Sequence, residues 1–185
     1  MSLIPVFDIG VWNAWIFSIF TFIYVGLVAM VVRKDIGDKM DHAKEEQKRL
    51  NIVSILWFII LVYSIFLPLK LGTAWLYTGI ALYVVGTVLL TLFFRDIAAT
   101  PPGQPFTRGA YRYSRNPMYI GMFVQFIGTA IAGASWLLLL LTLMIIVATW
   151  AVVLVEERTC LKKYGDTYRE YMDRTHRWIG LPKSG

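Results

Sequence analysis

Two pairs of charged residues stand beside apolar segments, where few charges are expected. Arg112 and Arg115 precede Asn116-Pro117 in the stretch YRYSRNPMYIG, residues 111–121, and Glu156-Glu157 follow the uncharged run from Trp136 to Val155. Arginine can hold a carboxylate or a phosphate, and glutamate can hold hydroxyl or ammonium groups. If the two pairs meet, they form either an ion-pair cluster or a site for a ligand of mixed charge. The residues alone leave both interpretations open.

The chain is apolar enough for most of it to lie in a membrane. Of its 185 residues 57% are hydrophobic and only 16% are charged, and the mean hydropathy is +0.59. A helix needs about 20 apolar residues to cross a bilayer. Candidate spans lie at about 11–32, 52–69, 74–94, 117–134 and 136–155, the fourth being short. We therefore expect an all-α polytopic membrane bundle of five transmembrane helices, with residues 1–185 forming a single membrane domain.

The basic residues sort to one side of these spans. All of the 18 lysines and arginines except Lys70 follow the first, third or fifth span. Cytosolic loops are rich in lysine and arginine, so we expect an integral membrane protein with its N-terminus outside and its C-terminus cytosolic. Span 1 is interpreted as an uncleaved signal anchor, and the loop after it as a solvated helical connector. With one cysteine and two distant histidines we expect no metal site, and we expect no nucleic-acid partner.

The turn GAS, Gly133 to Ser135, is so short that the fourth and fifth spans must be antiparallel neighbours. Asn116 suits an N-cap and Pro117 the first helical position, so the fourth helix is expected to begin there. Arginines are disfavoured at a helix N-terminus and glutamates at a C-terminus. We therefore expect Arg115 and Glu156-Glu157, each at the wrong end of its own helix, to lie side by side. Lipid phosphate could also offset the arginines, and this membrane-anchor interpretation stays open.

Small residues recur along the fourth predicted helix. Gly121, Gln125, Gly128 and Ala132 lie at helical spacing, which is typical of close helix packing in membranes, with Gln125 hydrogen-bonding across the contact.

The tail, residues 156–185, contains a helical stripe with charges on the opposite face. Leu161, Tyr164, Tyr168 and Tyr171 form this stripe. Such a segment is either an amphipathic helix on the bilayer surface or a lid whose aromatic face covers the charged cluster. Gly165 would interrupt a simple surface helix, which favours the lid, and Trp178-Ile179 would dock its end.

Three stretches follow one another over residues 105–180: GAYRYSRNPMYIG, EER and YGDTYREYMDRTHRWIG. Their order and spacing resemble the superfamily of isoprenylcysteine carboxyl methyltransferases and phospholipid methyltransferases, which are integral membrane enzymes. The pattern of that superfamily runs Gly-Pro-Tyr-Arg-Tyr, Arg-His-Pro-x-Tyr-x-Gly, a helical hairpin, Glu-Glu, and Tyr-Gly-x-x-Tyr-x-x-Tyr ending near Arg-hydrophobic-Pro.

The resemblance implies S-adenosylmethionine as methyl donor, bound at the cytosolic side between the loop before the fourth helix and the tail. It also implies a lipid or lipophilic small-molecule acceptor that enters from the bilayer. The cofactor-binding residues carried over by position are Gly109, Tyr111, Asn116, Pro117, Tyr119, Gly121, Glu156, Glu157, Tyr168, Tyr171 and Arg177. Two catalytic roles are hypotheses: Arg115 would hold an acceptor carboxylate or phosphate, and Glu157 would take a proton.

The sequence departs from the superfamily pattern at three positions. Asn116 stands where histidine is common, and Ala110 and Gly180 stand where proline is common. Asparagine can donate and accept hydrogen bonds but is no base near neutral pH. The change at Asn116 is therefore mild if that histidine only holds the cofactor, and important if it moves a proton.

Two other functions are alternatives. NADPH-dependent membrane enone or sterol reductases have a similar cytosolic tail, although five spans are few for such an enzyme and no dinucleotide phosphate loop is present. A non-catalytic helical scaffold could retain the same fold.

Overall fold

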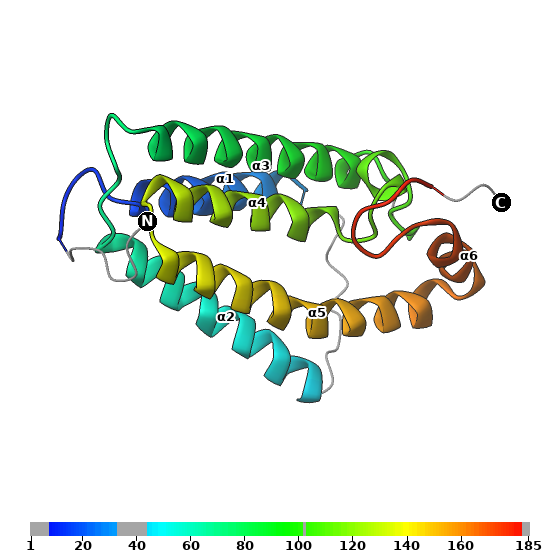
Figure 1. Ribbon diagram of the computed structural model, residues 1–185. Helices are drawn as coiled ribbons and strands as arrows, with labels where there is room; N and C mark the ends of the chain where they lie inside the picture. Colours follow the sequence, from blue (N-terminus) through cyan, green and yellow to red (C-terminus); the bar gives the residue numbers. More distant parts are fainter. Residues whose placement is uncertain (1–7, 33–43, 102, 183–185) are drawn as a thin grey trace.

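The computed structural model describes residues 8–32, 44–101 and 103–182 (Figure 1). The α-helices in these ranges are α1 (Trp15–Val32), α2 (Lys44–Ile65), α3 (Ala74–Ala98), α4 (Pro117–Ala132), α5 (Trp136–Tyr164) and α6 (Asp166–Arg174), and a short 3-10 helix, η1 (Gly109–Arg112), precedes α4. The all-α prediction is confirmed. Most of the loop predicted as a helical connector after the first span lies outside the described residues.

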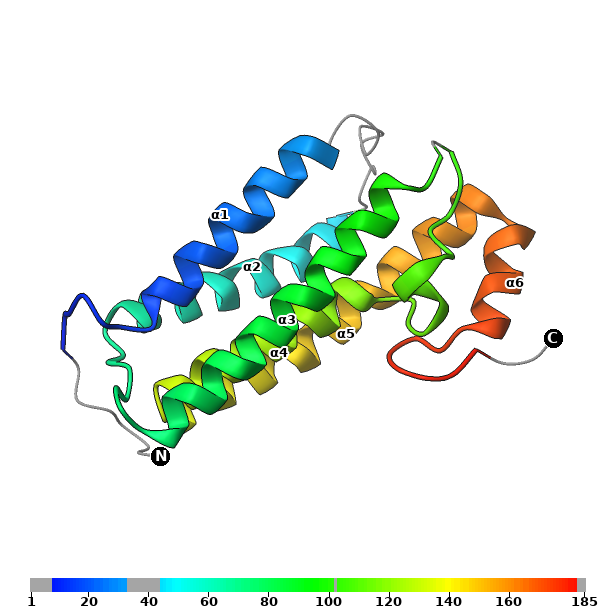
Figure 2. The ribbon, with the colours of Figure 1, turned by 90° about the horizontal axis from the view of Figure 1, so that it is seen from above.

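The chain direction alternates from α1 to α5, so the helix ends gather at two ends of the bundle (Figures 1 and 2). One end holds the last turns of α3 and α5, η1, the beginning of α4, and α6; we call it the motif end. The opposite end holds the α4–α5 turn and the segment between α2 and α3, which contains Lys70. This separates Lys70 from Arg115 and Arg177, as five crossings would require.

Two helices, α3 and α5, are long and apolar enough to cross a membrane by length and composition. Shorter apolar runs lie at Trp15–Tyr24, Asn51–Ile65 and Pro117–Ala132. Many large apolar side chains face outward, among them Phe58 and Val147, which are 65% and 73% exposed. Such a surface fits contact with lipid. The number of crossings and the orientation stay predictions.

Helix α5 runs past the predicted end of its span at residue 155 and ends at Tyr164. Glu156 and Glu157 therefore lie about two turns inside the helix, and the expectation that they stand at its C-terminus is wrong. The residue after the helix is Gly165, whose φ of 56° is in the left-handed region that glycine adopts without strain. Lys162 and Lys163 occupy the last turn, where positive charge is favoured.

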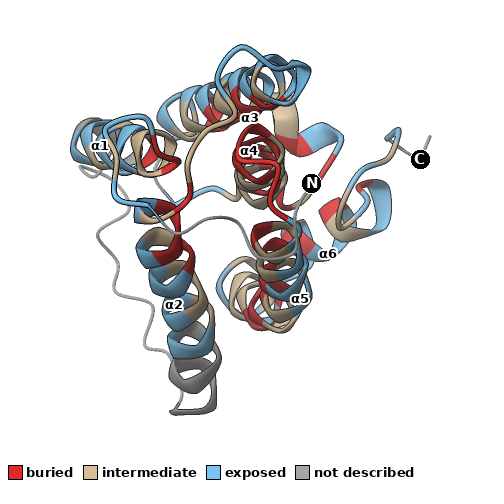
Figure 3. Ribbon diagram, turned by 60° about the vertical axis from the view of Figure 1, so that its left-hand side comes forward, coloured by how far each residue is buried: buried red, intermediate tan, exposed pale blue. Residues whose placement is uncertain are grey.

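Helix α4 is the most enclosed helix, packed against α3 and α5 (Figure 3). Glycines let the backbones of α3 and α4 approach closely: a Cβ on Gly79 would lie 2.5 Å from the carbonyl oxygen of Gly128, and one on Gly86 would lie 2.7 Å from that of Gly121. Gln125 donates a hydrogen bond across this contact to Thr87 Oγ1 at 2.8 Å. The predicted packing stripe of α4 is confirmed.

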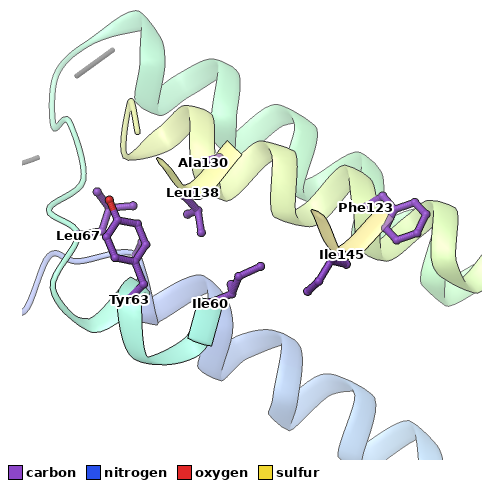
Figure 4. Close-up of a cluster of buried hydrophobic side chains, with 8 residues drawn as sticks. Ile60, Tyr63, Leu67, Phe123, Ala130, Leu138 and Ile145 are labelled. Atoms are coloured by element: carbon purple, nitrogen blue, oxygen red, sulfur yellow. The ribbon is translucent and has the colours of Figure 1, made fainter. Parts of the chain in front are cut away.

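An apolar cluster closes the opposite end of the bundle and fixes the α4–α5 hairpin. It gathers side chains from α2, α4, α5 and the segment after α2: Ile60, Tyr63, Leu67, Ala130, Leu138 and Ile145 (Figure 4). The Tyr63 hydroxyl lies 2.9 Å from Ser135 Oγ, and the same Oγ caps α5 by accepting from the Leu138 amide. The antiparallel hairpin predicted from the short turn is confirmed, and it places the start of α4 beside the end portion of α5.

The close α3–α4 contact predicts a position-specific loss of stability. Replacing Gly128→Val puts a side chain within 2.7 Å of Gly79 and Tyr83 backbone atoms, which cannot move aside independently. We expect a loss of about 1–3 kcal/mol, the usual range for overpacking, measured by denaturant unfolding in detergent. Gly26→Val on α1 is the matched control because no atom lies within 4 Å of its Cβ position. Equal losses in both variants would contradict this packing.

Candidate functional site

A cavity of about 340 Å³ lies at the motif end, enclosed by the last turns of α3, η1, the start of α4, the end of α5 and α6. Most of its lining is aromatic or aliphatic. The charged or hydroxyl-bearing residues among its walls are Tyr111, Arg115, Tyr119, Glu156, Glu157, Thr159, Lys163, Tyr164, Tyr168 and Tyr171. A cavity of this size, largely apolar with a few polar groups, is typical of a small-molecule site. We call it the polar cavity.

Glu157 is the centre of the charged groups. Its side chain is only 6% exposed. Arg177 donates to it from Nη2 at 2.8 Å and from Nε at 3.0 and 3.1 Å. The Nε of Arg115, whose side chain is 8% exposed, lies 3.3 Å from Glu157 Oε1. Arg115 and Glu157, one from each of the two charged pairs, therefore do meet as predicted. The carboxylate of Glu157 is paired with two arginines of the same chain.

The Nε of Arg115 is close enough to Glu157 for an ion pair but is not aligned for a hydrogen bond. It is buried and has no hydrogen-bond partner among the described residues. A buried donor without a partner is costly. Arg115 thus brings a positive charge to the wall of the polar cavity, while its buried Nε–H group has no hydrogen-bond partner among the described residues.

The tail after α6 is held against the segment before α4. The amide of Arg115 donates to the His176 carbonyl at 2.9 Å, and the amide of Gly180 donates to the Tyr113 carbonyl at 3.0 Å. The side chain of Asn116 donates from Nδ2 to the Arg177 carbonyl at 3.0 Å. Asn116 occupies the N-cap position, but its side chain does not cap α4. It clamps the tail instead, at the residue whose guanidinium group reaches Glu157.

Trp178 anchors this tail. Its ring packs against those of Phe123 and Trp150, and the Arg177 guanidinium group lies 5.4 Å from the centre of the Trp150 ring. Ile179, by contrast, is 76% exposed. The prediction that Trp178-Ile179 docks the tail is therefore right for Trp178 and wrong for Ile179, whose side chain is mostly exposed.

Helix α6 presents its tyrosines to the polar cavity. Tyr168 and Tyr171 are each 6% exposed and pack with Phe93 and Tyr111 in one cluster. Tyr171 donates its hydroxyl to the Tyr111 carbonyl at 2.8 Å. Burial raises the pKa of the Tyr111, Tyr168 and Tyr171 hydroxyls, so they stay protonated near neutral pH. The stripe breaks at Gly165, as predicted, and its buried half covers the cavity, as the lid interpretation requires.

Most of the residues carried over from the family pattern line the polar cavity: Tyr111, Arg115, Asn116, Pro117, Tyr119, Glu156, Glu157, Tyr168 and Tyr171. Tyr119 joins α4 to α5 by donating to Glu156 Oε1 at 2.9 Å. Arg177 contacts Glu157 without lining the cavity. Gly109 and Gly121 do not line it either. Gly121 packs against Leu90 of α3, where an added Cβ would lie 3.0 Å from Leu90 Cγ.

Asp96, which sequence reasoning missed, explains Gly109. The Asp96 side chain is 8% exposed and accepts hydrogen bonds from the Ala110 amide at 2.6 Å and from Arg95 at 3.0 Å. Gly109 has a φ of 60°, and any Cβ there would collide with the Asp96 carboxylate. Asp96 therefore anchors η1, which carries Tyr111. The one available signal was an acidic residue next to Arg95, just past the apolar run of the third span.

At the two positions where the superfamily commonly has proline, Ala110 and Gly180 each have an amide N–H group that donates a hydrogen bond. The Ala110 amide donates to Asp96, and the Gly180 amide donates to Tyr113. Proline could make neither hydrogen bond because it has no amide hydrogen.

The family comparison agrees with this arrangement. The sequence model of the phospholipid methyltransferase family matches residues 72–167. The chain belongs to the phospholipid methyltransferase family. None of the curated proteins compared with the chain matches it significantly. The family match runs from just before α3 into α6, so it includes the α3, α4 and α5 walls of the polar cavity and stops short of Tyr168, Tyr171 and Arg177.

Family membership confirms the resemblance expected from the motifs. Proteins of the phospholipid methyltransferase family are methyltransferases, and membership implies S-adenosylmethionine as the methyl donor. Together with the long apolar helices α3 and α5, it indicates an integral membrane protein.

The role of Asn116 as a clamp gives a testable prediction for this phospholipid methyltransferase family member. Asn116→Ala removes the donor to the Arg177 carbonyl, a hydrogen bond worth about 1 kcal/mol. We expect the amide hydrogens of Arg115 and Gly180, which pair with the tail, to exchange several-fold faster by mass spectrometry.

Asn116→His is the matched control for this prediction because a ring N–H can replace the amide donor. It should keep exchange at these two amides near that of the unmodified protein. Unchanged exchange in Asn116→Ala would show that Asn116 does not hold the tail.

Proposed function

We propose that this chain is an S-adenosylmethionine-dependent methyltransferase that methylates a lipid or lipophilic small molecule, with the polar cavity as its cofactor site. One observation carries the proposal: motif residues that are scattered along the chain from Tyr111 to Tyr171 line one cavity of small-molecule size. Family membership without such a cavity would be equally compatible with a scaffold.

The residues of the cavity fit this cofactor, which bears a carboxylate, an ammonium group, ribose hydroxyls and a sulfonium. Arg115 lines the cavity with a guanidinium group, which suits the carboxylate. Glu156, on the cavity wall beside Tyr119, suits hydroxyl or ammonium groups. The tyrosine faces of α6 and η1 suit a sulfonium through cation–π attraction. Their hydroxyls are neutral, since burial raises their pKa, so they add no charge.

When bound, S-adenosylmethionine supplies an electrophilic methyl group attached to the sulfonium. The contribution of the chain is to align the acceptor and exclude water, and alignment alone can lower a barrier by about 7–11 kcal/mol. We propose that α6 and the tail exclude water. Tyr168 and Tyr171 cover the cavity, and Asn116 holds the tail segment after α6 through the Arg177 carbonyl. An acceptor carboxylate or phosphate is the other candidate ligand of Arg115, because the residue lines the same cavity.

We propose a positioning role for Glu157. Both of its carboxylate oxygens already accept from the Arg177 guanidinium group, so neither is directed at a proton donor in the cavity. Glu157 orients Arg115 and Arg177 in this arrangement, and it takes a proton only after Arg177 has moved away. A carboxylate acceptor would need no base at all, whereas an amine would have to lose its proton first.

We also propose that the motif end faces the cytosol and that the five helices α1 to α5 each cross the membrane. The support is the charge distribution, because Lys70 lies at one end while the arginines of η1, Arg115 and the tail lie at the other.

Ligand binding separates the three functions considered for this chain. We expect calorimetry in detergent to show binding of S-adenosylhomocysteine, the product form of the cofactor, and none of NADPH. Arg115→Gln should weaken binding by about 10–100-fold, the loss of one charged hydrogen bond of roughly 1.5–3 kcal/mol. Arg169→Gln on the exposed side of α6, 68% exposed, is the control and should bind normally.

Binding of NADPH instead would indicate a reductase, and binding of neither ligand would indicate a scaffold. When the protein is given cofactor with a labelled methyl group in membranes, the label should move to the lipid-soluble fraction. No transfer to any lipid-soluble acceptor would contradict the proposed acceptor class.

A further inference from the structure

The segment 109–117 has two faces. Behind it lies a second hollow of about 560 Å³, bounded by the last turns of α3, η1, the start of α4 and Ile179. We call it the outer groove. Pro117 lines both the outer groove and the polar cavity. Segment 109–117 is thus a wall that separates the two hollows, and they do not share their charged residues.

The wall divides the arginines of the motif between its two sides. Arg115 lines the polar cavity, with its side chain 8% exposed and beside Glu157. Arg112, three positions earlier, is exposed and lines the outer groove, together with Arg95, whose side chain is 66% exposed. The short 3-10 turn of η1 and the bend that follows it send the two arginines in different directions.

The outer groove combines an apolar part and a cationic part. Its apolar residues are Leu89, Leu92, Ile120 and Ile179, and its charged residues are Arg95 and Arg112, with no acidic residue among the described residues that line it. Asp96, a buried carboxylate that does not line the groove, pairs with Arg95 and the Ala110 amide. Two arginines and this one carboxylate leave the groove with a net positive charge beside an apolar floor.

The order of these residues along α3 matches the order of groups in a phospholipid. Leu89 and Leu92 lie in the apolar part of α3, one of the two helices long enough to cross a membrane, and Arg95 follows them at its end. Lipid chains lie deeper in a bilayer than lipid phosphate, and anionic lipids attract arginines at the cytoplasmic surface. Ile179, which lines the groove, is 76% exposed and adds apolar surface at its rim.

We propose that the outer groove binds an anionic phospholipid, with its phosphate held by Arg95 and Arg112 and an acyl chain along Leu89, Leu92, Ile120 and Ile179. This lipid is not the methyl acceptor, because segment 109–117 separates it from the polar cavity. The groove is a second lipid site that holds η1 and the tail at the membrane surface. The position of the groove at the membrane surface rests on the proposed membrane orientation. Lipid binding in the groove does not depend on the proposed cofactor.

Photo-cross-linking tests this site. The purified protein is placed in nanodiscs of phosphatidylcholine containing a small fraction of phosphatidylglycerol with a photoactivatable acyl chain, and the adducts are mapped by mass spectrometry. We expect adducts within 89–92, at Ile120 and at Ile179. Excess unlabelled phosphatidylglycerol should abolish them, while added phosphatidylcholine or inorganic phosphate should not.

Two variants identify the groups responsible. Arg112→Gln should lower the yield of these adducts at least fivefold through loss of the phosphate contact, and Ile179→Asp should do so through loss of the acyl contact. Both side chains are exposed, so neither change disturbs the interior. Arg95 is left intact because it also contacts Asp96. Arg169→Gln, on exposed α6, is the charge-matched control and should keep the full yield.

Several results would overturn the proposal: no adducts in the groove of the unmodified protein, equal yields in Arg112→Gln, or displacement by phosphatidylcholine as effective as by phosphatidylglycerol. Displacement by inorganic phosphate alone would assign the groove to a free anion instead of a lipid. Binding of S-adenosylhomocysteine is measured on the same samples, so failure of the cofactor proposal is recorded separately from failure of the lipid proposal.

Discussion

The carboxylate of Glu157 is buried inside α5 at the motif end, and two arginines from distant parts of the chain converge on it. A buried charge without partners costs several kcal/mol, so the position of Glu157 in the helix requires that positive groups be brought to it. Arg115 arrives from the segment before α4, and Arg177 arrives from the tail after α6. The chain between them, through the α4–α5 hairpin and α6, forms walls of the polar cavity together with η1, which precedes Arg115.

The three departures from the superfamily pattern belong to the same arrangement. Ala110 and Gly180 each supply an amide hydrogen, one to Asp96 below η1 and one to the Tyr113 carbonyl beside the tail. Asn116 supplies a side-chain donor to the Arg177 carbonyl. All three positions therefore help to hold the wall and the tail together. A holding role for Asn116 requires a donor and no proton transfer, so we propose that its replacement of histidine is a mild change.

Local signals in the sequence predicted much of this arrangement. The three-residue GAS turn forced α4 and α5 together, Asn116-Pro117 marked the start of α4, and Gly165 marked the break before α6. The extension of α5 past Glu157 could not be predicted, because residues such as Arg158 and Lys162 are equally compatible with a helix and with a surface tail. Asp96 was missed because an irregular loop separates it from Ala110. Arg112 and Arg115 look like one cluster in the sequence, because only the backbone of η1 and the bend after it place their side chains on different sides.

A double-mutant cycle on Glu157 and Arg177 tests the central role of this ion pair most directly. Unfolding free energies are measured in detergent for Glu157→Gln, Arg177→Gln and the double variant. The same cycle on Glu170 and Arg174, an exposed pair at a similar 3.1 Å, is the reference. We predict a coupling of about 2 kcal/mol or more for the buried pair and below about 1 kcal/mol for the exposed one. Equal, small couplings in both cycles would contradict the account, because Glu157 would then not be what holds the tail over the cavity.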